Sequence, residues 1–497
     1  MKQRLRRAGS SSAALTRARL ATGDSVNYLM STPEHATDWV MYWVFENSVG
    51  VADVVKQVAE REPFVRALGR RVADVPRGLG NPYWVMDPTP LRERLVVRDE
   101  AVEWSSVLAA MADTFGSPLD LHEGTWRLTA FTSVAGAPVP GGAVATVVFA
   151  QVSHAILVGA QIAGLGRALF GAEPAELHID GAGDAVERER PTASAVLGVT
   201  RLPLEVIRWH LAQGRERHAL RRRTARRPMV ATIREKTDLN SPRRDSELAV
   251  RVIRPDLAPA QGRGITLTAL GMTAVSLAIE RYLAGLGQSC PDDLAAYVPV
   301  AIAGQRGRLG VNRISAVQAN LYPTITGPAA RAGAIHAHLR DAREAGHDAA
   351  KLALEVGAAV PFFVYLSLLR RGRLRTSWDA GSLWATSITS VRVDGDAELA
   401  LSDSPAVFGG HLVNVSTDAG LAHSFVGGTF GLTVTVTAST AALPDIDAYA
   451  VLLTQAFVDV TTAISEAPAV QSWDLGPSHR NSPARVIPAV PLSRGPG

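Results

Sequence analysis

Segments with the apolar spacing of helices alternate with short β-branched runs in both halves of this chain, and this alternation limits the possible folds most strongly. In the first half, AVATVVFAQVSHA (143–155) suits a buried strand, and AQIAGLGRALFG (160–171) suits a helix. In the second half, 266–287 is an expected amphipathic helix, and TFGLTVTVTAS (429–439) alternates like a strand. Such alternation predicts an α/β fold. Because 497 residues exceed one ordinary core, we expect two lobes.

The chain is expected to divide into five segments. Residues 1–25 form a basic leader that we expect to be flexible, and 476–497 form a Pro/Gly/Ser-rich flexible tail. An N-terminal lobe over 26–200 and a C-terminal lobe over 237–475 flank an arginine-rich linker over 201–236. The leader has no continuous apolar core before a cleavage site, so we do not interpret it as a secretion signal. No run of about 18 uncharged apolar residues predicts a membrane span, and we expect a cytoplasmic protein.

The linker is the most charged part of the chain. Eight arginines lie within 208–227, although the formal net charge of the whole chain is only +4. Such a run is typical of a solvated helix or loop. It also suits contact with an anionic membrane surface or with the phosphates of a ligand. We expect no nucleic-acid partner, because no nucleic-acid-binding module and few interleaved aromatic residues accompany the run.

Several common sites are not predicted. The glycine-rich pieces at 180–185 and 304–310 lack the strand-loop-helix context and the terminal Lys-Ser/Thr of a phosphate loop, so they are expected turns. His336 and His338 are two apart on an expected helix and point to different faces, which makes a poor metal pair. We therefore expect no metal. The single cysteine, Cys290, cannot form an internal disulfide and is expected to be a packed small residue.

His154 is the one histidine whose context indicates chemistry. It leaves the expected buried strand and precedes a helix rich in small residues, as a group at a lobe interface would. An imidazole with a near-neutral pKa can take a proton from a hydroxyl group. From spacing alone, a hydrogen-bonded core histidine is the more common alternative.

A series of motifs in a fixed order identifies a related family. These motifs are TPEHATDWVMYWVFEN, FVRALGRRV, LGNPYWVMDP, GTWRLTAFTSVAGA, SHAILVG, LGVNRISAVQANLYP, and HSFVGG with the later ALPDIDAY. Together, over about 29–464, they resemble the bacterial wax ester synthase/diacylglycerol acyltransferase family. That family is a branch of the CoA-dependent acyltransferases, which include nonribosomal condensation domains. The resemblance implies two similar mixed-sheet lobes around a central tunnel. It also implies acyl-CoA as a substrate, an alcohol acceptor and no cofactor.

The resemblance assigns roles within SHAILVG. This stretch aligns with the family's His-His-x-x-x-Asp-Gly, so His154 takes the place of the general base. Ser153 replaces the first histidine and is expected to donate a hydrogen bond near His154. Val158 replaces the aspartate, whose ion pair holds the loop in relatives. Gly159 is kept, and it lets the chain enter the next helix without a side chain in the tunnel.

Two further motifs depart from the family pattern. Thr268 and Ala269 stand where relatives have an Asn-Asp pair, and TSITS (386–390) stands where they have Ser-Asn-x-Pro-Gly. In that fold the asparagine-bearing segments help to shape the channel beside the histidine. These departures indicate changed substrates or lost activity.

The predicted function is O-acyl transfer from acyl-CoA to an alcohol or diacylglycerol, as in wax ester or triacylglycerol synthesis. One alternative is a non-catalytic homologue that binds lipid or a protein partner. Another is acylation or cyclisation of a specialised metabolite on a carrier protein, as condensation domains perform. We further expect the arginine-rich linker to hold a cytoplasmic protein at the periphery of an anionic membrane.

Overall fold

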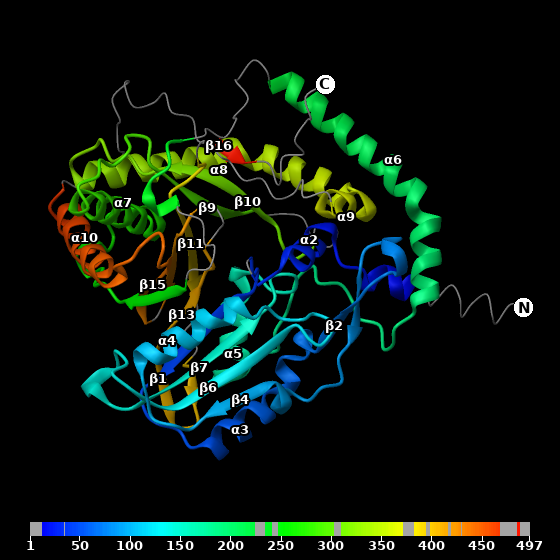
Figure 1. Cartoon of the computed structure of the whole chain (residues 1–497), viewed down its shortest axis with the longest axis horizontal. Helices are drawn as coiled ribbons and strands as arrows, with labels where there is room; N and C mark the ends of the chain where they lie inside the picture. The colour runs from blue at the N-terminus through cyan, green and yellow to red at the C-terminus, as the bar shows by residue number, and fades with distance from the viewer. Residues whose placement is uncertain are drawn as a thin grey trace, which may run out of the picture.

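The computed structural model describes most of the chain. The described residues are 12–33, 35–223, 234–240, 247–302, 310–370, 382–393, 398–415, 419–428, 430–467 and 485–487. Within them the chain forms two mixed sheets, a short hairpin-like sheet of β2 (Arg70–Ala73) with β3 (Tyr83–Met86), and covering helices. Figure 1 shows the two lobes, with the N-terminal half in blue to cyan and the C-terminal half mainly in green to orange. The expected α/β fold with mixed sheets in two lobes is confirmed.

The first sheet is built from both halves of the chain. Its strands, in spatial order, are β12 (Ala400–Leu401), β13 (Ser404–Leu412), β1 (Trp39–Phe45), β7 (Ala145–Val152), β6 (Trp126–Ala135) and β4 (Leu95–Arg98), and β5 (Val102–Glu103) also pairs with β6. β7 is buried along its whole length, as its β-branched sequence predicts. Helices α3 (Val51–Glu60) and α5 (Ile162–Phe170) pack on one face, and α4 (Trp104–Asp113) packs on the other.

The second sheet lies wholly in the C-terminal half. Its order is β16 (Arg485–Ile487), β10 (Ile314–Asn320), β9 (Ala295–Ala301), β11 (Thr386–Val393), β14 (Leu421–Gly428), β15 (Gly431–Ser439) and β8 (Leu248–Ile253). Helices α7 (Leu267–Gly285), α8 (Pro328–Ala359) and α10 (Ile446–Glu466) bury one face of this sheet. Of the described helices, α10 is long and apolar enough to cross a membrane, but its inner face packs into this core.

The chain departs from the expected segments in four places. Residues 12–18 are helical and α2 (Thr22–Met30) follows, with Leu15 and Asp24 buried, so this part of the expected leader packs on the body. Strands β12 and β13 come after residue 237, yet they complete the first sheet. Helix α6 (Pro191–Arg223) runs unbroken across the expected boundary at 200/201. Within the expected tail, β16 pairs with β10, and the remainder lies outside the described residues.

The crossover of β13 depends on two glycines. β13 pairs antiparallel with β1, with Tyr42 opposite Gly410 and Trp43 opposite Gly409. A Cβ atom on Gly409 would lie 2.8 Å from the Tyr42 carbonyl oxygen, which real side chains do not allow. The Tyr42 hydroxyl in turn lies 2.9 Å from the Thr435 hydroxyl of β15, so β1 contacts both sheets.

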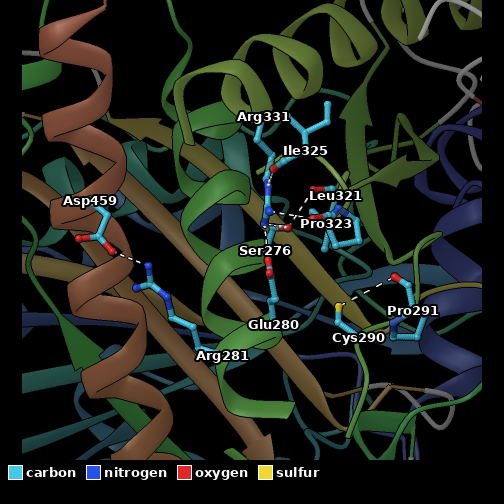
Figure 2. A network of polar contacts seen from close by, with 10 residues as sticks. All are labelled: Ser276, Glu280, Arg281, Cys290, Pro291, Leu321, Pro323, Ile325, Arg331 and Asp459. Atoms are coloured by element: carbon cyan, nitrogen blue, oxygen red, sulfur yellow. Dashed lines mark hydrogen bonds and ion pairs between the residues drawn. The ribbon is translucent and has the colours of Figure 1, made fainter. Parts of the chain in front are cut away.

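A buried arginine fixes the turn between β10 and α8 (Figure 2). Arg331 is only 1% exposed, and its guanidinium donates to the carbonyl oxygens of Pro323 and Ile325, both at 2.8 Å. It also donates to Glu280 at 2.9 Å and to the Ser276 hydroxyl at 3.1 Å, which ties α8 to α7. Each nitrogen of the buried guanidinium therefore has a partner, and Glu280, whose side chain stays 41% exposed, supplies the opposite charge. The satisfied network specifies the position of α8.

Candidate active site

His154 lies where β7 ends at the contact between the two halves. The chain turns immediately, because the Ser153 carbonyl accepts from the backbone N–H groups of Ile156 and Leu157 at 3.1 and 3.2 Å. The Ser153 side chain is buried, and its hydroxyl accepts from the Ala155 N–H at 3.2 Å. Ser153 therefore shapes the turn that presents His154, and its expected donation near the imidazole stays a prediction.

The loop after His154 is closed without the aspartate of the family motif. Val158 packs against the apolar core between the first sheet and helices α3 and α5. Its N–H donates to the Gln161 side-chain oxygen at 2.8 Å. The Val158 carbonyl accepts from the Gln161 backbone N–H at 2.8 Å. The side chain and the backbone of Gln161 therefore both hold the loop. A Cβ atom on Gly159 would lie 3.1 Å from Val391 of β11 and 3.4 Å from the Trp39 ring. Gly159 therefore allows both lobes to approach this loop closely.

The backbone of His154 is held from the second half of the chain. The Asn312 side-chain amide donates to the His154 carbonyl oxygen at 2.7 Å and to Asp24 at 2.8 Å. Asp24 also accepts from the backbone N–H groups of Val311 and Asn312, both at 3.1 Å. Burial raises the pKa of Asp24 to about 7, against the lowering effect of these hydrogen bonds. Helix α2, the short segment before β10 and the turn after β7 thus meet at the buried carboxyl group of Asp24.

The imidazole of His154 contacts the indole of Trp39 in a tilted arrangement. Their ring centroids are 5.0 Å apart at an angle of 44°, and Trp39 lies equally close to His411, at 4.9 Å. His154 as a whole is partly exposed, whereas its Nδ1 atom is buried. In the described part of the chain, His154 Nδ1, Trp39 Nε1 and Asn312 Oδ1 are all buried with no hydrogen-bond partner. Unpaired buried polar atoms are uncommon, and such a cluster is typical of a site that binds polar ligand atoms.

Burial sets the charge of His154. It lowers the pKa to about 4, and the carbonyl of His154 itself and the Asn312 side chain oppose this only in part. At neutral pH the imidazole is therefore uncharged and has a lone pair that can accept a proton.

His411 on β13 has a different environment, although its ring also contacts the Trp39 indole. It is fully buried, and the hydroxyls of Thr389 and Ser424 lie 3.0 Å from its Nε2 and Nδ1 atoms. Burial lowers its pKa to about 3. Thr389 belongs to TSITS and Ser424 to HSFVGG, so these two motifs meet at one satisfied core histidine.

An apolar cavity of about 60 Å³ lies beside β1, near Trp43. It is bordered by β1, α5 and the strands β11, β13, β14 and β15. Its lining includes Trp43, Ile162, Ala163, Val393 and Phe430, and Arg167 is the one charged group among the described lining residues. His154 is not among them. Trp39 and Trp43 share a face of β1, four residues or roughly 13 Å apart, so the cavity lies along β1 from the contact between Trp39 and His154.

The structure brings some of the predicted residues together and separates others. Ser153, Val158 and Gly159 lie with His154 in the turn and loop that follow β7. Thr268 and Ala269 are buried in the first turn of α7, where the Ala269 N–H donates to the Thr266 cap at 3.3 Å. The sequence does not predict Asp24 and His411 as site residues, because neither lies in one of the motifs that resemble the family. Trp39 and Asn312 lie inside two of these motifs, and this is the signal that could have identified them.

Comparison with known proteins shows the fold. No protein-family model matches the chain, and no curated protein sequence matches it. A wax ester synthase/diacylglycerol acyltransferase from Marinobacter aquaeolei VT8 is similar in structure, with a TM-score of 0.55 and 14% identity over 89% of this chain and 98% of that chain. A mutant starter condensation domain of rhizomide synthetase with C8-CoA gives 0.50 and 11%, over 94% and 99%. The first condensation domain of the calcium-dependent antibiotic synthetase, with a substrate analogue, gives 0.50 and 12%, over 91% and 97%. At these identities the likeness establishes a shared acyltransferase-like fold.

Proposed function

We propose that this protein is an O-acyltransferase that moves an acyl group from a CoA thioester to an alcohol, with His154 as the general base. The observation that carries this proposal is the uncharged imidazole of His154, a partly exposed residue whose backbone is fixed by Asn312 from the opposite half of the chain. A base must be held in place and unprotonated before it can act, and the Asn312 contact and the lowered pKa of His154 support these two conditions. The structural likeness to a wax ester synthase and to a condensation domain with C8-CoA supports an acyl thioester as the donor.

The proposed reaction proceeds by direct transfer. The imidazole accepts the proton of the alcohol while the alcohol oxygen attacks the thioester carbonyl carbon, which gives a tetrahedral intermediate with a negatively charged oxygen. When the intermediate collapses, the carbon–sulfur bond breaks and the CoA thiolate takes the proton from the imidazolium. The low pKa of His154 favours this return of the proton, since burial destabilises the charged ring.

The indole N–H of Trp39 is suited to the oxygen of that intermediate. It is a buried donor without a partner, and its ring lies 5.0 Å from the imidazole. A fixed donor aimed at a developing oxyanion contributes more in a dry site than in water. The apolar lining of the cavity along β1 suits part of a hydrophobic chain, but its volume of about 60 Å³ is smaller than the roughly 300 Å³ at the low end for ligand pockets, so a whole acyl or alcohol chain requires the cavity to widen.

Release of free CoA tests the proposal directly. Purified protein is mixed with octanoyl- or palmitoyl-CoA and with hexadecanol or diacylglycerol, and free thiol and ester product are measured. His154→Gln should lower kcat by about a hundred- to ten-thousand-fold, the usual range for a general base. His178→Gln, at a residue whose side chain is 87% exposed, is the matched control and should retain the parent rate. Equal turnover in parent and His154→Gln would remove the base from the mechanism, and no ester from any acceptor would favour the non-catalytic homologue.

A further inference from the structure

Helix α6 presents a row of large apolar side chains to solvent. These residues, each between 48% and 58% exposed, are Val196, Val199, Leu204, Ile207 and Leu211. At 100° per residue, they fall within an arc of roughly 140° on the helix surface. Isolated exposed apolar residues are common, whereas a continuous stripe of them on one helix marks an interaction surface. We call this row the α6 stripe.

The opposite face of α6 packs on the protein. Leu202, Val206 and Trp209 are half-buried, and α6 contacts α8. Figure 1 shows α6 along one edge of the molecule, reaching beyond the first lobe past α9. The stripe therefore faces outward, and the described residues of this chain leave it uncovered.

Positive charge borders the α6 stripe. Arg201, Arg208 and Arg215 recur at intervals of seven residues, so they follow one side of the helix beside the stripe. Among the exposed residues of α6 whose side chains the structure describes, none is Asp or Glu. The acidic Glu205 is half-buried, and it pairs with Arg19 at 2.8 Å. The outward face is therefore apolar and basic.

We propose that the α6 stripe and its arginines dock the protein on an anionic lipid surface. A helix with large apolar side chains on one side and arginines along its border lies in the membrane interface, with the apolar side inserted and the arginines at the headgroups. A second copy of this chain is a poorer fit, because two antiparallel stripes would bring two rows of arginines together without acidic partners. A lipid surface with anionic headgroups satisfies both parts of the face. This inference concerns location and does not depend on the proposed reaction.

Vesicle co-sedimentation tests the inference with the full-length protein and no substrate. The parent should bind vesicles of phosphatidylcholine with phosphatidylglycerol, and bind pure phosphatidylcholine at least tenfold more weakly. Arg208→Gln/Arg215→Gln should weaken binding to the anionic vesicles by about 25-fold, since each arginine near such a surface contributes about fivefold. Ile207→Ser/Leu211→Ser should also weaken binding at least tenfold, since the apolar insertion is lost.

Exposed apolar residues on another helix give the matched control. Val451 and Val458 of α10 are 69% and 52% exposed, so Val451→Ser/Val458→Ser removes similar apolar surface outside α6. This variant should bind anionic vesicles like the parent. Binding that falls equally in both serine pairs, or a parent that does not bind anionic vesicles, would overturn the inference. A parent dimer that Ile207→Ser/Leu211→Ser dissociates, with no vesicle binding, would instead assign the stripe to a contact between copies.

Discussion

Replacing Asp24 by asparagine should make the stability of this protein depend less on pH. Asp24 is 2% exposed, and its carboxyl group accepts from two backbone N–H groups and from the Asn312 side chain. Burial nevertheless dominates and raises the pKa to about 7. The folded protein therefore holds a proton on Asp24 through much of the range in which the unfolded chain has lost it.

The sign and the size of this pH dependence of the free energy of unfolding follow from proton linkage. Because the folded-state pKa lies above the unfolded value of 3.8, the stability contributed by protonated Asp24 is complete below pH 3.8 and is lost as the pH rises through 7. At about 1.4 kcal/mol per pKa unit, the full loss is about 4 kcal/mol. Asparagine does not ionise, so the Asp24→Asn variant should not show this loss. Its free energy of unfolding, relative to the parent, should rise by about 4 kcal/mol between pH 4 and pH 8.

Urea unfolding followed by tryptophan fluorescence measures this difference. Both proteins are unfolded at several pH values from 4 to 8, and the difference in free energy of unfolding is plotted against pH. The difference also cancels the opposite contribution of the buried histidines, which both proteins share. Glu100→Gln, at an exposed position, controls for the removal of one negative charge. A difference that stays flat, or that falls with rising pH, would refute the reasoning. A difference that falls with rising pH would mean that the three N–H donors lower the pKa of Asp24 more than burial raises it.

Two further predictions concern the proposed site. Asn312→Ala removes the donor to the His154 carbonyl and should lower kcat about tenfold or more. The change in KM should be smaller, because the base is misplaced while the substrate chains still bind. An unchanged kcat would contradict a positioning role for Asn312. Trp39→Phe keeps an aromatic ring, although a smaller one, and removes the N–H, so kcat should fall by about a hundredfold in the CoA-release assay. Trp384→Phe, which removes another buried and unpaired indole N–H, should leave kcat unchanged, and an equal loss in both would show a packing effect.

Local patterns were sufficient for the elements that carry the site. The β-branched run before His154 predicts a buried strand, and the small-residue segment after it predicts a helix; they are β7 and α5. The helix expected at 266–287 is α7, but it is not amphipathic, because Thr268–Ile279 are buried without a break. β7 and α5 follow from side-chain spacing because each buries apolar residues in a core, and that requirement is visible in neighbouring residues.

Contacts between distant segments could not be predicted in the same way. The crossing of β13 into the first sheet and the pairing of Asp24 with Asn312 join residues hundreds of positions apart. The basic run in α6 was visible in the sequence, but the outward position of its apolar stripe depends on which face packs against α8.

The sequence by itself determined the alternation of helices and strands, the position of His154 at a strand end, and the order of motifs that resembles an acyltransferase family. Only the tertiary structure decided which groups surround that imidazole. It placed the Trp39 indole against the ring, and it brought the Asn312 amide to the His154 carbonyl. The physical reason is that burial and hydrogen bonding set the pKa and orientation of a side chain, and both depend on residues that are remote in the chain.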